Sequence, residues 1–363
     1  MHKKSAEIGK FCMDYEIKLV ETDAGASADY QSVIDNSSDS TVLHTLEWRD
    51  VIQDTLGDES RYFVCYEDGR PVAALPAFIR KTELGAVFNS LAFSGSYGGV
   101  CISKDAADPQ DAAAALLVRA LDSARDEGCL TATFIASPLS NNLRALYMET
   151  VKPDFVYDRI TQFTDLTKPL SFKPSVRNHV SKALRLGVMV KTELTSANLD
   201  WFYSAYTANM EHLGLAPKPR SFFDSVASRM CPAGRAKFYF AFADGTLVSG
   251  LLMFFYRNGA KNHETCFDRA NAKYQGNSLL LDSALRESKR AGYEYFNWGA
   301  SENRECGVYK FKAAWGAEEH SYSYYTKMLR DCSALRAAGS KQILDTFGRF
   351  YYVIPFSWLE NDQ

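Results

Sequence analysis

The sequence predicts an α/β (α+β) protein made of two mixed-sheet domains in tandem, related by internal duplication. The chain has 363 residues, more than a single hydrophobic core usually supports. Two long segments of its second half repeat segments of its first half in the same order. We therefore expect one domain over residues 1–165, a second over 166–330, and a helical, aromatic tail over 331–363.

The first repeated segment is a β-hairpin. The run RYFVCYEDGRPVAALPAFIR, from Arg61, aligns without gaps on KFYFAFADGTLVSGLLMFFY, from Lys237. The Asp-Gly pair at 68–69 falls on the pair at 244–245. Asp-Gly between apolar runs is typical of a tight hairpin, because glycine readily takes the positive φ that the turn needs.

The second repeated segment is a helix end followed by a strand. LDSARDEGCLTATFIAS, from Leu121, matches LRESKRAGYEYFNWGAS, from Leu285, and Gly128 and Gly292 fall at the expected helix ends. Glycine is favoured there because the residue after a helix often adopts the left-handed conformation. Two matches in the same order indicate duplication.

Patterning gives the remaining elements. In the first half we expect a strand at 15–20, a helix at 44–56, the hairpin, a strand at 87–102, a helix at 109–127 and a strand at 130–136. In the second half we expect helices at 174–186, 197–213, 220–230 and 278–290, a short helix near Tyr309, the hairpin, and strands at 188–193, 261–268, 293–298 and 322–328.

Composition excludes several function classes. The net charge of −3 indicates no global attraction to DNA or to an anionic membrane. The eight cysteines show no paired spacing, which argues against a zinc site and suits a reducing cytoplasm. Motifs of serine hydrolases, zinc proteases, P-loop NTPases and Rossmann dehydrogenases are missing from the sequence. We expect a cytoplasmic protein with no metal and no tightly bound cofactor.

Four motifs carry a family resemblance. They are RNHVSKALRLGVMV, which includes Gly187, YQGNSLLLDSALRESKRAGYEYFNWGAS, GVYKFKAAWGAE, and SYGGV at 96–100. Over residues 45–328 the chain resembles tandem GNAT-fold acyltransferases of the FemABX-like type, which include peptidoglycan bridge and exopolysaccharide-associated FemAB-like proteins. The chain departs from that pattern in its donor turn, which is only NAKYQGNS, and in lacking the long helical hairpin that some relatives insert for tRNA.

The resemblance implies transfer of an acyl or aminoacyl group from an activated donor. The donor would be acyl-CoA or aminoacyl-tRNA, and the missing insertion favours a donor other than tRNA. The acceptor would be an amine on a cell-envelope, peptidoglycan or polysaccharide precursor, either a small molecule or lipid-linked. We expect at most peripheral contact with a membrane.

The turn at 272–278 is the candidate donor site. It precedes a helix, whose N-terminal N–H groups could hold a pyrophosphate, and Gly276 permits close approach. An ordinary loop capped by Asn277 or Ser278 is the alternative. The candidate donor-binding residues are Tyr274, Gln275, Gly276, Asn277, Ser278, Lys310 and Lys312.

The strand NHETCFD carries the candidate catalytic residues. Alternation predicts His263, Thr265 and Phe267 on one face, and Asn262, Glu264, Cys266 and Asp268 on the other. An amine must lose a proton before it attacks an acyl donor, so we expect a base among Glu264, Asp268 and His263. The resemblance adds Tyr309 as the group that protonates the leaving group. A solvated polar strand face is the alternative.

Two regions are candidate acceptor sites. The helix at 174–186 has an apolar stripe of Val176, Val180 and Leu184, with basic residues on its other faces. The second region follows a strand, at the edge of the sheet where ligands usually bind. The candidate acceptor-binding residues are Arg177, Lys182, Arg185, Trp298, Ser301 and Glu302. For the helix, a merely solvated face is the alternative.

Two further alternatives concern the tail and the function. The run GRFYYVIPFSWLE, from Gly348, suits either a membrane interface or docking on the protein's own core. The chain could also be a non-catalytic GNAT-like module that binds a glycan, a nucleotide or a protein. Because almost every candidate lies after residue 170, we expect the first copy to be a scaffold or to serve the acceptor side.

Overall fold

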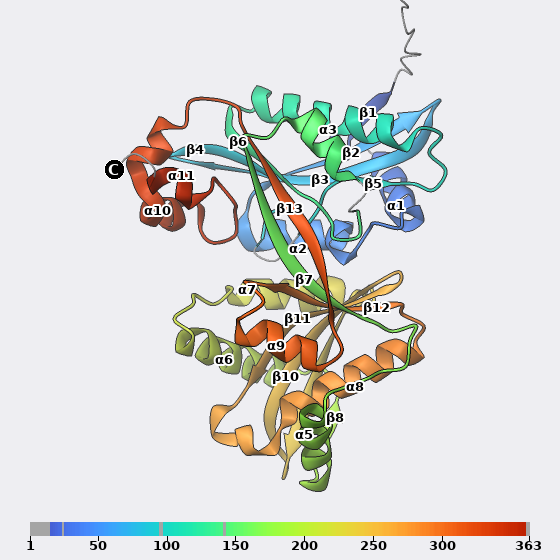
Figure 1. The fold of residues 1–363 in the computed structure, drawn as a ribbon, viewed down its shortest axis with the longest axis vertical. Helices are drawn as coiled ribbons and strands as arrows, with labels where there is room; N and C mark the ends of the chain where they lie inside the picture. The colour runs from blue at the N-terminus through green and yellow to red at the C-terminus, as the bar shows by residue number, and fades with distance from the viewer. Residues whose placement is uncertain (1–14, 24, 94–96, 141–142, 361–363) are drawn as a thin grey trace, which may run out of the picture.

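The computed structural model describes residues 15–23, 25–93, 97–140 and 143–360. Figure 1 shows two lobes stacked along the long axis of the molecule, one formed by most of the first half together with the tail after residue 330, and the other by most of residues 166–317. Helices pack on a single mixed sheet that runs through both lobes, so the predicted α/β class is confirmed.

The first half contains the hairpin and long helix that were predicted. Its strands are β1 (Glu16–Leu19), β2 (Glu59–Glu67), β3 (Arg70–Thr82), β4 (Gly85–Ser90), β5 (Cys101–Ile102), β6 (Cys129–Ile135) and β7 (Phe155–Asp165). Its helices are α1 (Ala26–Asn36), η1 (Val42–His44), α2 (Leu46–Leu56), α3 (Pro109–Asp126) and α4 (Arg144–Val151). Asp108 caps α3 through the Asp111 N–H at 3.2 Å, as its position before Pro109 predicts.

The second half repeats this order. Its strands are β8 (Met189–Lys191), β9 (Ala236–Ala243), β10 (Thr246–Tyr256), β11 (Gly259–Phe267), β12 (Tyr295–Ser301) and β13 (Glu318–Met328). Its helices are α5 (Pro174–Arg185), α6 (Ser196–His212), α7 (Arg220–Ser225), η3 (Val226–Met230), η4 (Arg269–Tyr274), α8 (Gly276–Arg290) and α9 (Gly307–Ala314). The tail forms α10 (Ser333–Phe347) and α11 (Phe356–Glu360).

The two halves exchange strands where they meet. The strand order is β1-β2-β3-β4-β6-β13-β7-β12-β11-β10-β9-β8, with β5 beside β3. The last strand of the second half, β13, therefore lies between β6 and β7 of the first half, and β7 in turn pairs with β12. Figure 1 shows β7 and β13 as the long strands that join the lobes. The boundary expected at residues 165 and 166 falls directly after β7.

Three buried clusters hold the fold together. One lies between α3 and the first-half sheet, and another lies between α5, α8 and the second-half sheet. The third joins the halves, since it contains Tyr30 and Trp48 of the first half together with Phe222 and Phe254 of the second. Trp48 packs edge-on against Phe222 and Phe254, at ring-centroid distances of 6.0 and 5.6 Å.

The strand predicted over 87–102 is wrong in its middle. β4 ends at Ser90 and pairing resumes only at Cys101, because the glycine pair at 98–99 turns the chain back between β4 and β6. Gly98 N–H donates to the Ile135 carbonyl at 2.9 Å, and Gly99 N–H donates to Ser90 Oγ at 3.0 Å. This segment, residues 97–100, closes the gap beyond the β4–β6 ladder. Residue 96 of the SYGGV motif lies outside the described residues.

The tail docks on the body of the protein. Asn89 Nδ2 donates to the Tyr352 carbonyl at 2.8 Å, and Asn89 Oδ1 accepts from the Tyr352 N–H at 2.8 Å. Phe350 stacks on Phe93 with a centroid distance of 4.9 Å, and Tyr351 donates to Asp58 at 3.0 Å. Core docking, rather than a membrane interface, accounts for the aromatic run.

Candidate active site

The strands β11 and β12 separate in the middle of the second-half sheet. Their parallel ladder has three rungs, which end at Lys261 and Asn297, although β11 continues to Phe267 and β12 to Ser301. The β12–β7 pairing is also irregular between Asn297 and Ala300. The facing edges therefore open beyond the third rung. In the first half, by contrast, β4 and β6 stay paired to the end of β4 and the 97–100 segment closes the gap.

A cavity of about 450 Å³ lies at this opening, between the two halves. We call it the central cavity. Its walls come from β4, β7, β11, β12, β13 and the tail. Its lining residues include Asn89, Phe93, Tyr157, Arg159, Lys218, Lys261, Asn262, His263, Glu264, Trp298, Gly299, Tyr322, Tyr324, Arg349 and Tyr352.

Lys261 is the most unusual of these side chains. It is 8% exposed, and its ammonium lies 5.9 Å from the ring centre of Tyr97. No described residue accepts a hydrogen bond from its Nζ atom. Burial lowers the pKa of Lys261 to about 8, although the nearby Glu264 carboxylate opposes that effect. Lys261 is thus close to its protonation midpoint near neutral pH.

Glu264 and Lys218 form a largely buried ion pair in the same cavity. The Lys218 ammonium also lies over the rings of Phe93 and Phe222, at 5.6 and 5.9 Å from their centres. Removing either partner would leave a buried charge uncompensated, so the pair holds the Glu264 carboxylate in place.

His263 lies in an aromatic box. Its ring stacks on Phe254 at 4.2 Å, with Phe222 at 5.4 Å and Trp48 at 5.8 Å. Nε2 is buried and has no hydrogen-bond partner. Burial, reinforced by Lys218 and Lys261, holds the pKa of His263 well below its ordinary value, so the ring is neutral.

The strict alternation predicted for NHETCFD is wrong at its start. The pairing of β10 with β11 shifts register opposite Leu252 and Met253, so Glu264 and Asn262 become the partners of successive residues and His263 is the extra one. A bulge redirects side chains in this way. Asn262, His263 and Glu264 consequently all line the central cavity.

Two other candidate catalytic residues lie away from the central cavity. Asp268 caps η4, since its carboxylate accepts from the Ala270 N–H at 3.0 Å and from Asn271 Nδ2 at 2.7 Å. Tyr309 is on α9, where its carbonyl accepts from Gln162 at 3.2 Å. Neither residue is among the cavity walls.

The strand-end candidates are divided between the cavity and its surroundings. Trp298 lines the cavity and donates to Thr164 Oγ1 at 2.9 Å. Ser301 is buried behind it, Glu302 is exposed, and Lys310 is exposed on α9.

Lys312 is buried beneath the opening. Its ammonium donates to the carbonyls of Gly299 and Ala300 at 2.9 and 2.7 Å and to Ser301 Oγ at 3.2 Å. Burial and the charge of Lys261 lower the pKa of Lys312 to about 7. The side chain thus fixes the irregular stretch of β12 from below.

The donor turn leads from β11 into α8. Gln275 is the residue before the helix, with a φ of 57°, and no side chain caps the helix, which differs from the alternative in which Asn277 or Ser278 is the cap. Gly276 is buried, and a Cβ there would lie 2.7 Å from Ser249 Oγ. Tyr274 is tied to Asp244 at 2.9 Å. None of the turn's residues lines the central cavity.

The basic helix is not part of the central cavity either. Arg177, Lys182 and Arg185 are exposed on α5, which Figure 1 places at the end of the second lobe far from the first. Leu184 departs from the predicted apolar stripe, because it is 60% exposed whereas Val176 is buried. The stripe ends early since Ala183 makes the last contact with the core.

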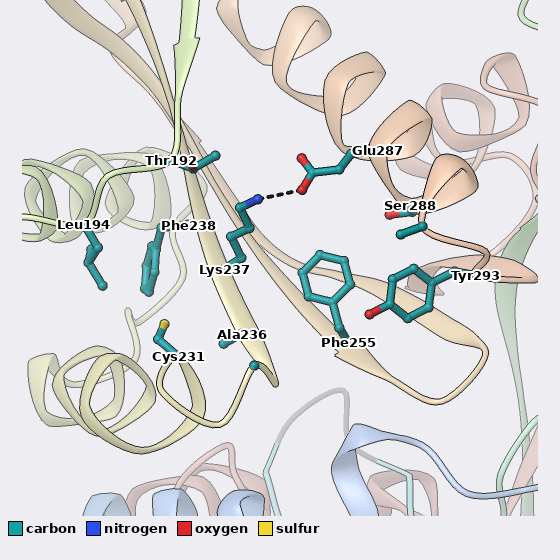
Figure 2. Close-up of a pocket in the computed structure, with 12 residues that line it drawn as sticks. Thr192, Leu194, Cys231, Ala236, Lys237, Phe238, Phe255, Glu287, Ser288 and Tyr293 are labelled. Carbon is teal, nitrogen blue, oxygen red and sulfur yellow. Dashed lines mark hydrogen bonds and ion pairs between the residues drawn. The ribbon is translucent and has the colours of Figure 1, made fainter.

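A second pocket, of about 430 Å³, lies where α8 ends beside β9 (Figure 2). Lys237 and Glu287 pair across it at 2.6 Å, above Phe255 and Tyr293. In the first half the residue equivalent to Lys237 is Arg61, which pairs with Glu127. The charged groups of this pocket are therefore satisfied by each other, and the central cavity remains the better candidate site.

Several cavity residues escaped sequence reasoning. Lys218, Arg159 and Arg349 come from three separate segments, and no local pattern predicts a role for them. The sequence predicts Lys261 only as the first residue of a strand, with no role. The strand of Lys261 also carries Asn262, His263 and Glu264, so no signal in the sequence indicates that the lysine is buried, although a buried lysine usually has a function or a partner.

Comparison with known proteins identifies the fold. Residues 171–313 match the acetyltransferase (GNAT) domain family. The crystal structure of FemX superposes with a TM-score of 0.67 at 13% identity, covering 82% of this chain and 95% of FemX. None of the curated proteins matches in sequence.

Two further structures share the arrangement. A tandem GNAT protein from the clavulanic acid biosynthesis pathway gives a TM-score of 0.57 at 13% identity, covering 88% of this chain and 99% of that one. L-PGS from Bacillus licheniformis gives 0.56 at 12% identity, covering 88% and 94%. The predicted resemblance is confirmed at the level of the fold: this chain has the tandem GNAT fold that FemX shares, and the family match falls in its second half.

Two kinds of feature are absent from the described residues. Within the described residues, no helix is long and apolar enough to cross a bilayer. The same part of the chain contains no cluster of three histidine, cysteine or carboxylate side chains arranged to hold a metal ion.

Proposed function

We propose that this protein transfers an acyl or aminoacyl group from acyl-CoA or aminoacyl-tRNA to an amine of a cell-envelope, peptidoglycan or polysaccharide precursor. The observation that carries the proposal is the opening between β11 and β12, which leads directly into a cavity holding Lys261 and Glu264. The equivalent gap of the first half is closed by its own chain. Only the second half is therefore proposed to bind the donor.

The donor would enter along the separated strands. Their unpaired backbone edges can hydrogen-bond the acyl carbonyl and the charge that develops on its oxygen. The uncapped N–H groups at Gly276 and Asn277 can hold donor phosphates, with Tyr274, Gln275 and Ser278 around them. Lys310 is free to add a charge, whereas Lys312 would position β12.

The acceptor would occupy the central cavity. Four cations line it, Arg159, Lys218, Lys261 and Arg349, against the single carboxylate of Glu264. Arg159 Nε is buried with no partner. This excess of positive charge supports an anionic acceptor, as a phosphate-bearing envelope or polysaccharide precursor would be.

The chemistry is a substitution at the acyl carbon. The acceptor nitrogen attacks that carbon and forms the C–N bond, while the C–S or C–O bond to the donor breaks. The proton lost by the amine passes to Glu264 or to the neutral form of Lys261, and from there to the leaving thiolate or alkoxide. A base with a pKa near the working pH serves this step best, and Lys261 meets that condition.

The test combines binding and turnover. Thermal shift would be measured with acetyl-CoA, aminoacyl-tRNA, nucleotide sugars and glycans, because a true donor should stabilise the native protein by mass action. Amines of peptidoglycan and polysaccharide precursors would then be screened by mass spectrometry for an acyl adduct. Stabilisation by a donor and a product lost in Glu264→Gln are expected. Stabilisation by glycan or nucleotide alone, without product, would instead favour a binding module.

A further inference from the structure

The surface around α5 has a charge pattern unlike the rest of the chain. Between residues 166 and 192 there are six lysines and arginines and no aspartate or glutamate, although the whole chain has a net charge of −3. The cations are Lys168, Lys173, Arg177, Lys182, Arg185 and Lys191. Such a local excess attracts anionic surfaces even when the global charge does not.

Lys182 and Arg185 are the cations of this set that are available to a partner. Lys168 pairs with Asp165 at 3.0 Å, but no carboxylate in the described residues pairs with Lys182 or Arg185. Asp282, on the helix α8 that packs against α5, is held by Arg286 at 2.9 Å. The positive charge is therefore not neutralised within the protein.

Apolar side chains project from the same surface. Leu184 is 60% exposed, Leu186 is 40% exposed and Met189 is 56% exposed. They lie at the end of α5 and at the start of β8, interleaved in sequence with Lys182, Arg185 and Lys191. Leaving three large aliphatic side chains in water, close together, is unfavourable unless something covers them.

We propose that this surface, the α5 patch, docks the protein on an anionic lipid bilayer. The cations would lie among the lipid phosphates, while Leu184, Leu186 and Met189 would insert into the interface between headgroups and acyl chains. Both parts are needed, because binding of a peripheral surface combines apolar area with electrostatic attraction to anionic lipid. The proposal concerns where the protein works and does not depend on the reaction that it catalyses.

Other occupants match the patch less well. RNA is usually held by cations together with aromatic side chains that stack on bases, and the exposed apolar residues here are aliphatic. A second copy related by a two-fold axis would bring two cationic faces together, which is repulsive.

The experiment measures co-sedimentation of the full chain with vesicles. Binding is expected to phosphatidylcholine vesicles containing phosphatidylglycerol, not to phosphatidylcholine alone, and should weaken at high salt. Two double variants divide the patch: Lys182→Gln with Arg185→Gln removes charge, and Leu184→Ser with Met189→Ser removes apolar surface. The charge variant should bind about 25-fold more weakly, because each of the two cations that it removes contributes about five-fold to the affinity. The apolar variant should bind at least about ten-fold more weakly.

Matched controls lie on the first half and the tail. Lys341→Gln removes an exposed cation from α10, and Val118→Ser removes a 48% exposed apolar side chain from α3. Both should bind vesicles like the wild type. Equal losses in controls and patch variants would overturn the proposal, as would absence of binding to anionic vesicles. Tight tRNA binding lost only in the charge variant would reassign the patch to RNA, and a dimer lost only in the apolar variant would reassign it to a second copy.

Discussion

Tyr97 of the first half and Asn297 of the second half are joined by a hydrogen bond, in which the asparagine amide donates to the phenol oxygen. Asn297 forms the last rung of the β11–β12 ladder, and its Oδ1 accepts from the Gly299 N–H at 2.7 Å. The segment that closes the gap in the first half thus also supports the point where the second-half strands separate. The two halves depend on each other at the candidate site.

Tyr97→Phe should damage the site more than a hydroxyl deletion usually does. The Asn297 amide would lose its buried acceptor, which costs about 1–3 kcal/mol in free energy of unfolding. The free energy of unfolding, measured with urea, and kcat/KM for acyl transfer should both fall. Tyr62→Phe is the matched control, because the Tyr62 hydroxyl is buried without a partner and its removal should be neutral or stabilising. Equal behaviour of the two variants would contradict a supporting role for Tyr97.

Lys261→Met should stabilise the protein near neutral pH. The pKa of Lys261 falls from 10.5 to about 8 on burial, so the unfolded chain binds more protons between those values and stability rises with pH across that window. At pH 7 the buried charge lowers the free energy of unfolding by about 3 kcal/mol, because each unit of pKa corresponds to about 1.4 kcal/mol. Urea unfolding at pH 7 to 10 should show a more stable, flatter profile for the variant. If the two proteins instead show parallel profiles of stability against pH, burial of the charged form of Lys261 does not lower stability. Lys312 is common to both proteins, but the charge of Lys261 helps to lower its pKa, so the variant should also relieve part of the cost of charging Lys312.

Glu264→Gln should lower turnover by about 100-fold or more, the range expected for a lost general base. The substitution keeps the shape of the side chain but leaves Lys218 without its counter-charge, so stability should fall as well. Combining it with Lys218→Met removes both charges and should restore stability without restoring turnover. Kinetics unchanged between pH 6 and 9 in the single variant would remove Glu264 from the mechanism and leave Lys261 as the base.

Gly276→Ala tests the donor turn. The new methyl group would lie 2.7 Å from Ser249 Oγ and 3.1 Å from Val248 Cγ2, so the turn must move. We expect the KM for the donor to rise by about ten-fold, while the KM for the acceptor is unchanged. Gly307→Ala, which meets no atom within 4 Å, is the control. A rise in the KM for the acceptor alone would show that the donor does not bind at this turn.

Asn89→Ala tests the docking of the tail. The substitution removes both hydrogen bonds to Tyr352 and should cost about 2 kcal/mol in local stability. Because Tyr352 and Arg349 line the central cavity, the acceptor KM should rise too. Hydrogen exchange should become faster over residues 348–356. Unchanged exchange there would show that the stacking of Phe350 on Phe93 is sufficient.

The local parts of this architecture could be predicted from sequence, and the long-range parts could not. Asp-Gly turns, the cap at Asp108 and the helix-ending glycines act over a few residues, so both hairpins and the helix–strand repeats were predicted within a few residues of their observed ends. The repeated order predicts a short helix and a terminal strand at the end of each half, but the bounds of α4 and β7 were not predicted, because the partners of β7 are β12 and β13, far along the chain. For the start of the first half the order allows one or two helices, and bounds are predicted only for the later one, α2.

The site divides in the same way. Glu264, His263 and Trp298 were predicted from polar or terminal positions in strands, and all three line the cavity. Lys218 reaches the cavity, and Tyr97 reaches Asn297, only through tertiary packing. The prediction that Leu184 belongs to a buried stripe is wrong. Helical spacing shows that Leu184 shares a face with Val176 and Val180, but it does not show how far along the helix the neighbouring core extends.

The position of β13 has a consequence for synthesis. The ribosome makes residues 318–328 long after β6 and β7, yet this strand belongs between them. A nascent chain therefore exposes two open strand edges until β13 has emerged, and the sheet that joins the lobes cannot be completed before then. A chain that stops short of residue 318 would present those edges to its neighbours as a template for aggregation.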